Sequence, residues 1–102
     1  MDKLEFIENT DTHHYEAVLE GNVVGFIAYR ESNGARLLTH TEVNLDLEGR
    51  GVGSQLVKFA LERIKASGSS LVPMCPFVAV YIQRHREYSD LVKQGHHAMY
   101  GL

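Results

Sequence analysis

The stretch Glu48-Gly49-Arg50-Gly51-Val52-Gly53 divides the sequence into two halves with different hydrophobic periods. Three glycines within five residues allow backbone angles that other residues avoid, and they let a ligand approach the main chain closely. The segment after them has helical spacing, so its first turn offers unpaired N–H groups and the positive end of a helix dipole. This combination favours a bound phosphate or pyrophosphate, although a plain glycine-rich turn before a helix gives the same pattern.

Two familiar phosphate-binding loops do not fit this stretch. A Walker loop places Lys-Ser or Lys-Thr after its last glycine, whereas Ser54-Gln55 follows here. The dinucleotide-binding fingerprint requires a parallel sheet, with an acidic residue at the end of the strand after the helix. Here the preceding strands are linked by hairpins, and the next strand ends in Pro73-Met74-Cys75.

The half before the glycine stretch has the composition and turns of an antiparallel meander. Gly21-Asn22 and Asn33-Gly34 are hairpin signals, because both residue types tolerate a positive φ angle. Short turns of this kind join antiparallel neighbours. The strands predicted between them cover residues 4–7, 14–19, 23–30 and 35–45.

The half after the glycine stretch changes to helical spacing. Apolar residues recur every three or four positions from Gly51 to Ser67, and Gly68 supplies a left-handed stop. We then expect a buried strand over 71–74, a second helix over 77–86 and one helical turn over 89–93. The resulting order is β-β-β-β-α-β-α, with the last strand parallel to its predecessor.

Composition limits the class of protein. The 102 residues carry a formal net charge of -3 with scattered lysines and arginines, which argues against a nucleic-acid-binding face. We expect one domain over residues 1–102, because no linker or repeat is visible. Neither a signal peptide nor a membrane-spanning run is apparent, and the single cysteine suits a reducing compartment, so we expect a cytoplasmic protein without membrane partners.

The segment from Val43 to Gly53 resembles motif A of the GNAT superfamily of acetyl-CoA-dependent N-acetyltransferases. That motif is Gln or Arg, two residues, Gly, one residue, then Gly or Ala. Further segments are similar to a small stand-alone subgroup that lacks the N-terminal helices of larger relatives. These segments are His40-Thr41-Glu42-Val43, Cys75-Pro76-Phe77, Tyr81-Ile82 and His85 to Tyr88, so the resemblance spans about residues 4 to 93.

The resemblance implies an α+β (α/β) fold of minimal GNAT type, with a mostly antiparallel twisted sheet. It implies acetyl-CoA as co-substrate, an amine acceptor and no metal. The backbone at Val43 and Leu45 would pair with the pantetheine arm, and the sheet would splay open near Met74. The pyrophosphate would be held by main-chain N–H groups at Arg50, Gly51, Val52, Gly53 and Ser54.

Two positions depart from the family pattern. Glu48 stands where the family has Gln or Arg, and we expect its carboxylate to turn towards solvent, away from a pyrophosphate. Larger relatives often carry a tyrosine on the last helix that protonates the leaving thiolate. Gln83 occupies that position here, with Tyr81 two residues away.

Cys75 is a candidate catalytic residue, since it lies at a strand end and before a helix, where a thiol pKa is lowered. It could accept the acetyl group covalently or transfer a proton; alternatively, it packs against the co-substrate. His40 and Glu42 alternate onto one face of a strand and could deprotonate an ammonium. Their alternative is a solvated strand face.

The remaining candidates receive simpler interpretations. His85 could help to line the co-substrate or acceptor site, but a surface position is favoured. His13-His14 and His96-His97 are not expected to bind a metal, because adjacent residues of a strand point to opposite faces. The aromatics Tyr15, Phe26 and Phe59 are expected in the core. The functional hypotheses are an N-acetyltransferase acting on an unidentified amine, or an acyl-CoA-binding module with little catalysis. We expect a monomer or a weak dimer.

Overall fold

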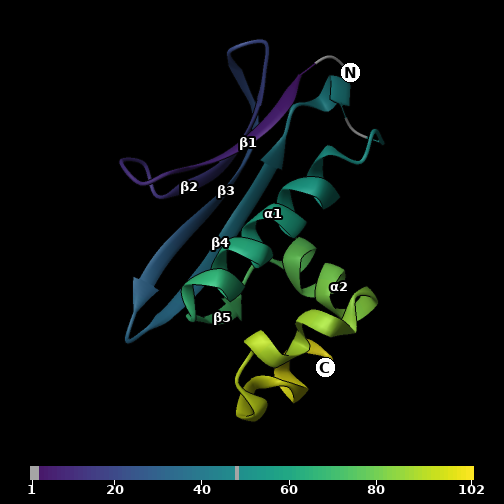
Figure 1. The fold of residues 1–102 in the computed structure, drawn as a ribbon. Coiled ribbons are helices and arrows are strands. Elements are labelled where there is room, and N and C mark those ends of the chain that lie inside the picture. Colours follow the sequence, from purple (N-terminus) through teal and green to yellow (C-terminus); the bar gives the residue numbers. More distant parts are fainter. Residues whose placement is uncertain (1–2, 48) are drawn as a thin grey trace.

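A computed structural model describes residues 3–47 and 49–102, and Glu48 with its predicted orientation lies outside them. Over the described residues the chain forms five strands, two α-helices and a series of 3₁₀ helices (Figure 1). In chain order these are β1 (Leu4–Asn9), β2 (His14–Leu19), β3 (Asn22–Ser32), β4 (Ala35–Val43), η1 (Leu45–Leu47), α1 (Val52–Ser67), β5 (Ser70–Pro73), α2 (Pro76–Arg84), η2 (Arg86–Leu91), η3 (Gln94–His96) and η4 (Ala98–Tyr100).

The sheet has the order β1-β2-β3-β4-β5. The first four strands form an antiparallel meander, and β5 pairs with β4 in parallel after the α1 crossover. The predicted order β-β-β-β-α-β-α and the parallel last strand are therefore confirmed. The hairpin residues Asn33 and Gly34 both have a positive φ, which is the conformation that their residue types favour.

Several element boundaries differ from the prediction, and the difference at β4 bears on function. β4 ends at Val43, whereas the strand was predicted to continue to Leu45. The Asn44 N–H donates to the Val24 carbonyl as the last bond to β3, and the Leu47 N–H then donates to the Asn44 carbonyl. The chain turns at this point, so Leu45 begins η1 and its side chain is 79% exposed.

The core lies between one face of the sheet and α1. Tyr15 and Ala17 of β2 and Ile27 of β3 are fully buried against it, and they alternate with residues on the other face. α1 contributes a matching stripe, which comprises Val52, Leu56, Val57, Ala60, Leu61 and Ile64. The prediction of a core position is confirmed for Tyr15, and Phe59 packs partly buried against the cluster.

α2 and η2 lie beside α1 at the β5 edge of the sheet (Figure 1). Val78 and Ile82 of α2 belong to the same core cluster as α1. The Tyr88 hydroxyl of η2 donates to the Glu62 carboxylate of α1 over 2.6 Å. Burial and this hydrogen bond raise the pKa of Tyr88. Both α2 and η2 thus add to the core on the α1 side of the sheet.

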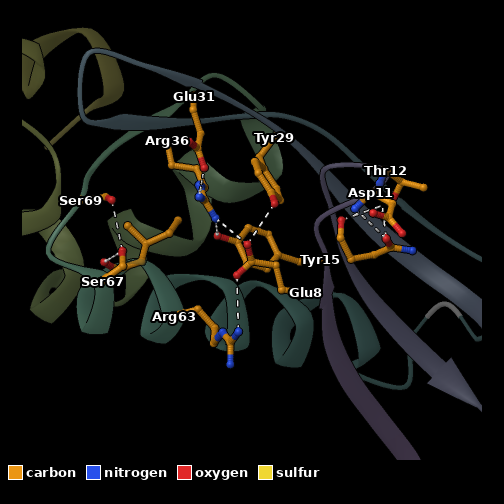
Figure 2. Close-up of polar contacts among 12 residues, drawn as sticks. Glu8, Asp11, Thr12, Tyr15, Tyr29, Glu31, Arg36, Arg63, Ser67 and Ser69 are labelled. Carbon is orange, nitrogen blue, oxygen red and sulfur yellow. Dashed lines mark hydrogen bonds and ion pairs between the residues drawn. The ribbon is translucent and has the colours of Figure 1, made fainter.

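A polar network ties the far ends of β1, β3 and β4 to α1 (Figure 2). One Glu8 carboxylate oxygen accepts from the Tyr29 hydroxyl and from Arg36, each over 2.9 Å. Arg36 also donates to the Tyr15 hydroxyl, and Arg63 of α1 approaches the other Glu8 oxygen at 3.6 Å. Burial and the bond to Glu8 raise the pKa of Tyr29 to about 12.

Within the described residues, no helix is both long enough and apolar enough to span a bilayer.

Candidate active site

β4 and β5 separate part of the way along their length, which opens a gap at one end of the sheet. Their parallel pairing runs from Ala35↔Ser70 to Leu38↔Pro73. The Cys75 N–H makes a last bond to the Leu38 carbonyl over 2.9 Å. Beyond this point β4 continues to Val43 while the chain after β5 turns into α2. The predicted splay near Met74 thus coincides with the end of the parallel pairing.

The free edge of β4 beyond this splay presents backbone groups of Thr41 and Val43. In an antiparallel pair, residues alternate between hydrogen-bonded and non-hydrogen-bonded positions. The Asn44–Val24 bond and the register Val43↔Gly25 place residues 40, 42 and 44 in bonds to β3. The N–H and C=O groups of Thr41 and Val43 therefore point away from β3, towards α2. Leu45, the second predicted pairing residue, lies in η1 instead.

A cavity of about 430 Å³ lies between this β4 edge and the glycine stretch, and we call it the loop cavity. Of the seven predicted co-substrate residues, Val43, Gly51, Val52, Gly53 and Ser54 line it, whereas Leu45 and Arg50 do not. Four further residues complete the wall: Thr41, Leu47, Gly49 and Phe77.

Main-chain donors at the start of α1 adjoin the loop cavity. Gly51 is the N-cap residue, with φ 78°, and none of the described side chains makes a cap hydrogen bond at this helix start. The first turn of such a helix leaves the N–H groups of Val52, Gly53 and Ser54 without intrahelical partners. The Arg50 N–H is different, because it donates to the Leu47 carbonyl over 3.2 Å. The helix end therefore offers three main-chain donors and a positive dipole end.

Gly53 lies where α1 and α2 approach closely. A Cβ atom at this position would lie 2.9 Å from Cζ of Phe77 and 3.6 Å from Cγ2 of Val43. The absent side chain thus keeps the Phe77 ring against the start of α1, where both residues line the loop cavity.

Cys75 lies behind the wall of the loop cavity, at the N-cap of α2. Its side chain is buried, and Sγ lies 3.3 Å from Oγ1 of Thr41, which lines the cavity. The Cys75 carbonyl accepts from the N–H groups of Val78 and Ala79, which fixes the start of the helix. Both the thiol, through Thr41, and the Cys75 N–H, through Leu38, therefore contact β4 at the splay.

His40 and Glu42 lie on the opposite face of the sheet from Thr41 and Val43. The two side chains are paired, with His40 Nε2 3.5 Å from Glu42 Oε1, and both are more than half exposed. The Thr41 side chain meets Cys75, and alternation turns its neighbours in the strand to the other side. The structure therefore does not gather the three predicted catalytic residues on one face; it places them on either side of β4.

α2 buries Tyr81, whereas Gln83, which stands where larger relatives carry a tyrosine, is exposed. Gln83 donates to the Tyr100 carbonyl over 2.8 Å and so holds the C-terminal segment. Tyr81 is 9% exposed, and its ring stacks on His85 with 3.9 Å between ring centroids. Burial, followed by the charges of Glu87 and Glu62, raises the pKa of Tyr81. His85 is half-buried rather than fully at the surface, and its Nδ1 lies 2.8 Å from the Tyr81 carbonyl.

In the part of the chain that the structure describes, no group of three or more His, Cys, Asp or Glu side chains is placed to hold a metal ion.

Four residues that line the loop cavity were not among the predicted co-substrate residues: Thr41, Leu47, Gly49 and Phe77. Thr41 precedes Val43 by two positions, so strand alternation could have identified it as the second residue on the free edge. Phe77 follows Cys75-Pro76, and its contact with Gly53 depends on the angle between two helices, which the sequence pattern does not contain.

The comparisons with known proteins agree with this geometry. The family model described as GCN5-related N-acetyl-transferase matches residues 14–91. The chain is similar, at 26% identity and a TM-score of 0.69, to a GCN5-like putative N-acetyltransferase from Staphylococcus aureus solved by NMR, over 90% of each chain. No curated protein matches the chain.

Two larger solved proteins also share part of the fold. The IAA acetyltransferase from Bacillus cereus matches 57% of this chain and 40% of its own length, at 30% identity and a TM-score of 0.51. The ribosomal-protein-alanine N-acetyltransferase from Brucella melitensis matches 78% of this chain and 60% of its own, at 22% identity and a TM-score of 0.52. The chain thus spans less than two thirds of these two proteins.

Proposed function

We propose that this chain, which belongs to the GCN5-related N-acetyltransferase family and is an acyltransferase, transfers an acetyl group from acetyl-CoA to an amine. The observation that carries the proposal is the loop cavity, which joins a free strand edge to a helix N-terminus at a splay in the sheet. Acetyl-CoA supplies the activated thioester when bound.

The lining of the loop cavity fits the two chemically different parts of this co-substrate. The main-chain N–H groups of Val52, Gly53 and Ser54 are suited to the pyrophosphate. The backbone groups of Thr41 and Val43 can pair with the amides of the pantetheine arm as an added strand would. Arg50 is left out of this set, because it does not line the cavity and its N–H is bonded to the Leu47 carbonyl.

Direct transfer requires an amine that has lost its proton and a thioester held beside it. The C–N bond forms as the C–S bond breaks, and CoA leaves as a thiolate that takes up a proton. The His40–Glu42 pair can accept the ammonium proton on the uncovered face, and the Cys75 thiol or Tyr81 hydroxyl can protonate the thiolate. In the alternative route, Cys75 Sγ bonds to the acetyl carbon as the C–S bond to CoA breaks, and the thiol proton passes to the departing CoA thiolate. The amine then attacks this new thioester and releases the Cys75 thiolate, which takes up the proton that the amine loses.

A calorimetric or NMR titration with acetyl-CoA, with CoA and ATP as comparison ligands, tests the proposal. We expect saturable binding of the two CoA species and amide shifts at Thr41 to Ser54 and around Cys75. Acetyl transfer to a panel of amines then tests turnover by mass spectrometry. No binding at millimolar acetyl-CoA would reduce the glycine stretch to a helix entry and overturn the proposal.

A further inference from the structure

The face of the sheet opposite α1 carries two rows of paired side chains across β2, β3 and β4. The registers align His14, Ala28 and His40 in one row, and Glu16, Phe26 and Glu42 in the next. Phe26 thus has a carboxylate on each neighbouring strand. Its ring stacks on His14 with 4.4 Å between centroids and lies 5.9 Å from His40. Phe26, predicted in the core, is instead a half-buried platform on this face.

The two carboxylates beside Phe26 differ in their surroundings. Glu16 is 7% exposed, and Asn9 Nδ2 approaches its two oxygens at 3.4 and 3.5 Å. Glu42 is open to solvent apart from its contact with His40. Glu42 therefore has the accessible carboxylate, while the covered Glu16 also lies 3.9 Å from His14 Nδ1. A cation beside Glu42 would meet this carboxylate and the part of the Phe26 ring that His14 does not cover, and a carboxylate and an aromatic face each attract a cation.

Phe26 and Glu42 also line a cavity of about 660 Å³ at the end of β4, which we call the strand-end cavity. Thr41 and Val43 line both this cavity and the loop cavity, so both cavities adjoin the last residues of β4. The outer wall of the strand-end cavity is apolar and exposed, with Val23 at 50% and Leu45 at 79% exposure. A ligand here would pass apolar side chains first and reach the carboxylate near the splay.

We infer that the strand-end cavity is the acceptor subsite, and that it takes a primary ammonium group at the end of an unbranched aliphatic stem. The stem lies along Val23 and Leu45, and the ammonium sits between the Glu42 carboxylate and the Phe26 ring. The role of this subsite as an acceptor site rests on the proposed acetyl transfer, but binding of the amine needs no acetyl-CoA. The amine reaches the splay from one side of β4, and acetyl-CoA reaches it from the loop cavity on the other side.

An NMR titration at low salt tests the subsite with three probes: N-α-acetyl-lysine amide, n-pentylamine and the uncharged N-α-acetyl-norleucine amide. We expect both amines to shift the amides of Val23, Phe26, Glu42 and Leu45, and the norleucine compound to bind at least several-fold more weakly. Binding by both amines identifies a free alkylamine site, whereas binding by the lysine compound alone identifies the side chain of a polypeptide. Equal binding of the norleucine compound, or shifts confined to other residues, would overturn the inference.

Three single-residue variants in the same titration test which side chains bind the amine. Glu42→Gln should weaken amine binding by about three- to fivefold, the range of an exposed charge pair, and Phe26→Leu should weaken it while preserving bulk. Glu87→Gln removes an equal charge from η2 and should leave the amine affinity unchanged. An unchanged amine affinity in Glu42→Gln would contradict the proposed subsite. Acetyl-CoA binding is measured in a separate titration, so failure of the proposed function can be distinguished from failure of this subsite.

Discussion

At the scale of single residues, Gly51 has a conformation that connects stability to binding. Its φ of 78° lies in the left-handed region, and it caps α1 beside the loop cavity. Gly34 has the same φ of 78° in the β3–β4 hairpin, with open space around it. Gly51 and Gly34 therefore have the same φ angle but different surroundings, so Gly34 can serve as a control.

Gly51→Ala should lower acetyl-CoA affinity by about tenfold, because the strained residue shifts the first-turn N–H groups away from a bound pyrophosphate. Gly34→Ala is the matched control. Both substitutions should lower the free energy of unfolding by about 1–2 kcal/mol, the ordinary cost of a left-handed alanine. Denaturant unfolding and calorimetric titration of both variants provide the measurements. Equal acetyl-CoA affinities in the two variants would separate Gly51 from the binding site.

Cys75→Ala should reduce the turnover number by roughly 10²-fold if the thiol transfers a proton or carries the acetyl group. Its acetyl-CoA dissociation constant should stay within about twofold, because Thr41, not Cys75, lines the loop cavity. Steady-state kinetics and calorimetry measure the two effects. Full turnover in the variant would assign Cys75 to packing against Thr41.

At the scale of elements, the polar network at the far end of the sheet contributes stability that depends on pH. Burial alone would raise the pKa of Glu8, but hydrogen bonds from Tyr29 and Arg36 and the charges of Arg36 and Arg63 outweigh it and lower the pKa below 4.5. A carboxylate with a lowered pKa in the folded state stabilises the protein above its unfolded pKa. This stability is lost as the pH falls below about 4.5 and through the folded pKa.

Glu8→Gln should therefore lower the free energy of unfolding at neutral pH by about 2 kcal/mol, the range of hydrogen bonds to a charged group. The same variant should show a shallower loss of stability in acid. Glu31→Gln is the control, since Glu31 also pairs with Arg36 but its side chain is 62% exposed against 13% for Glu8. It should cost less than about 1 kcal/mol. Urea unfolding between pH 3 and 7 measures the loss of stability in each variant. Equal losses would indicate that the exposed Arg36–Glu31 pair stabilises the protein as much as the Arg36–Glu8 pair.

The elements themselves were largely predictable, because each depends on local signals. Hairpin turns and helical spacing indicated the strands and α1, and Gly68 marked the helix end. The end of β4 was not predictable, since the apolar Leu45 continues the strand pattern and only the Asn44–Val24 bond and the following turn end the pairing. The glycine loop was identified from three residues in sequence. The position of Glu42 beside Phe26 depends on the register between strands, which no local pattern specifies.

At the scale of the whole molecule, the two cavities determine the expected order of events. They share Thr41 and Val43 but open on different sides of the β4 edge, one towards the start of α1 and the other towards the start of β3. An acyl donor in the first cavity leaves the second open. Donor and acceptor can therefore be bound together at the splay, and a covalent enzyme intermediate is not required by the geometry.

Initial rates measured against both substrates should consequently give intersecting double-reciprocal lines, the pattern of a ternary complex. Parallel lines would indicate that the acetyl group leaves CoA before the amine binds. The acetyl group would then be carried by Cys75, whose Sγ contacts Thr41 between the two cavities. Mass spectrometry of protein mixed with acetyl-CoA alone provides the control. We expect no stable acetyl adduct on Cys75 in that mixture, because direct attack needs the amine. An adduct that a later amine removes would contradict the ternary route and replace it with the two-step one.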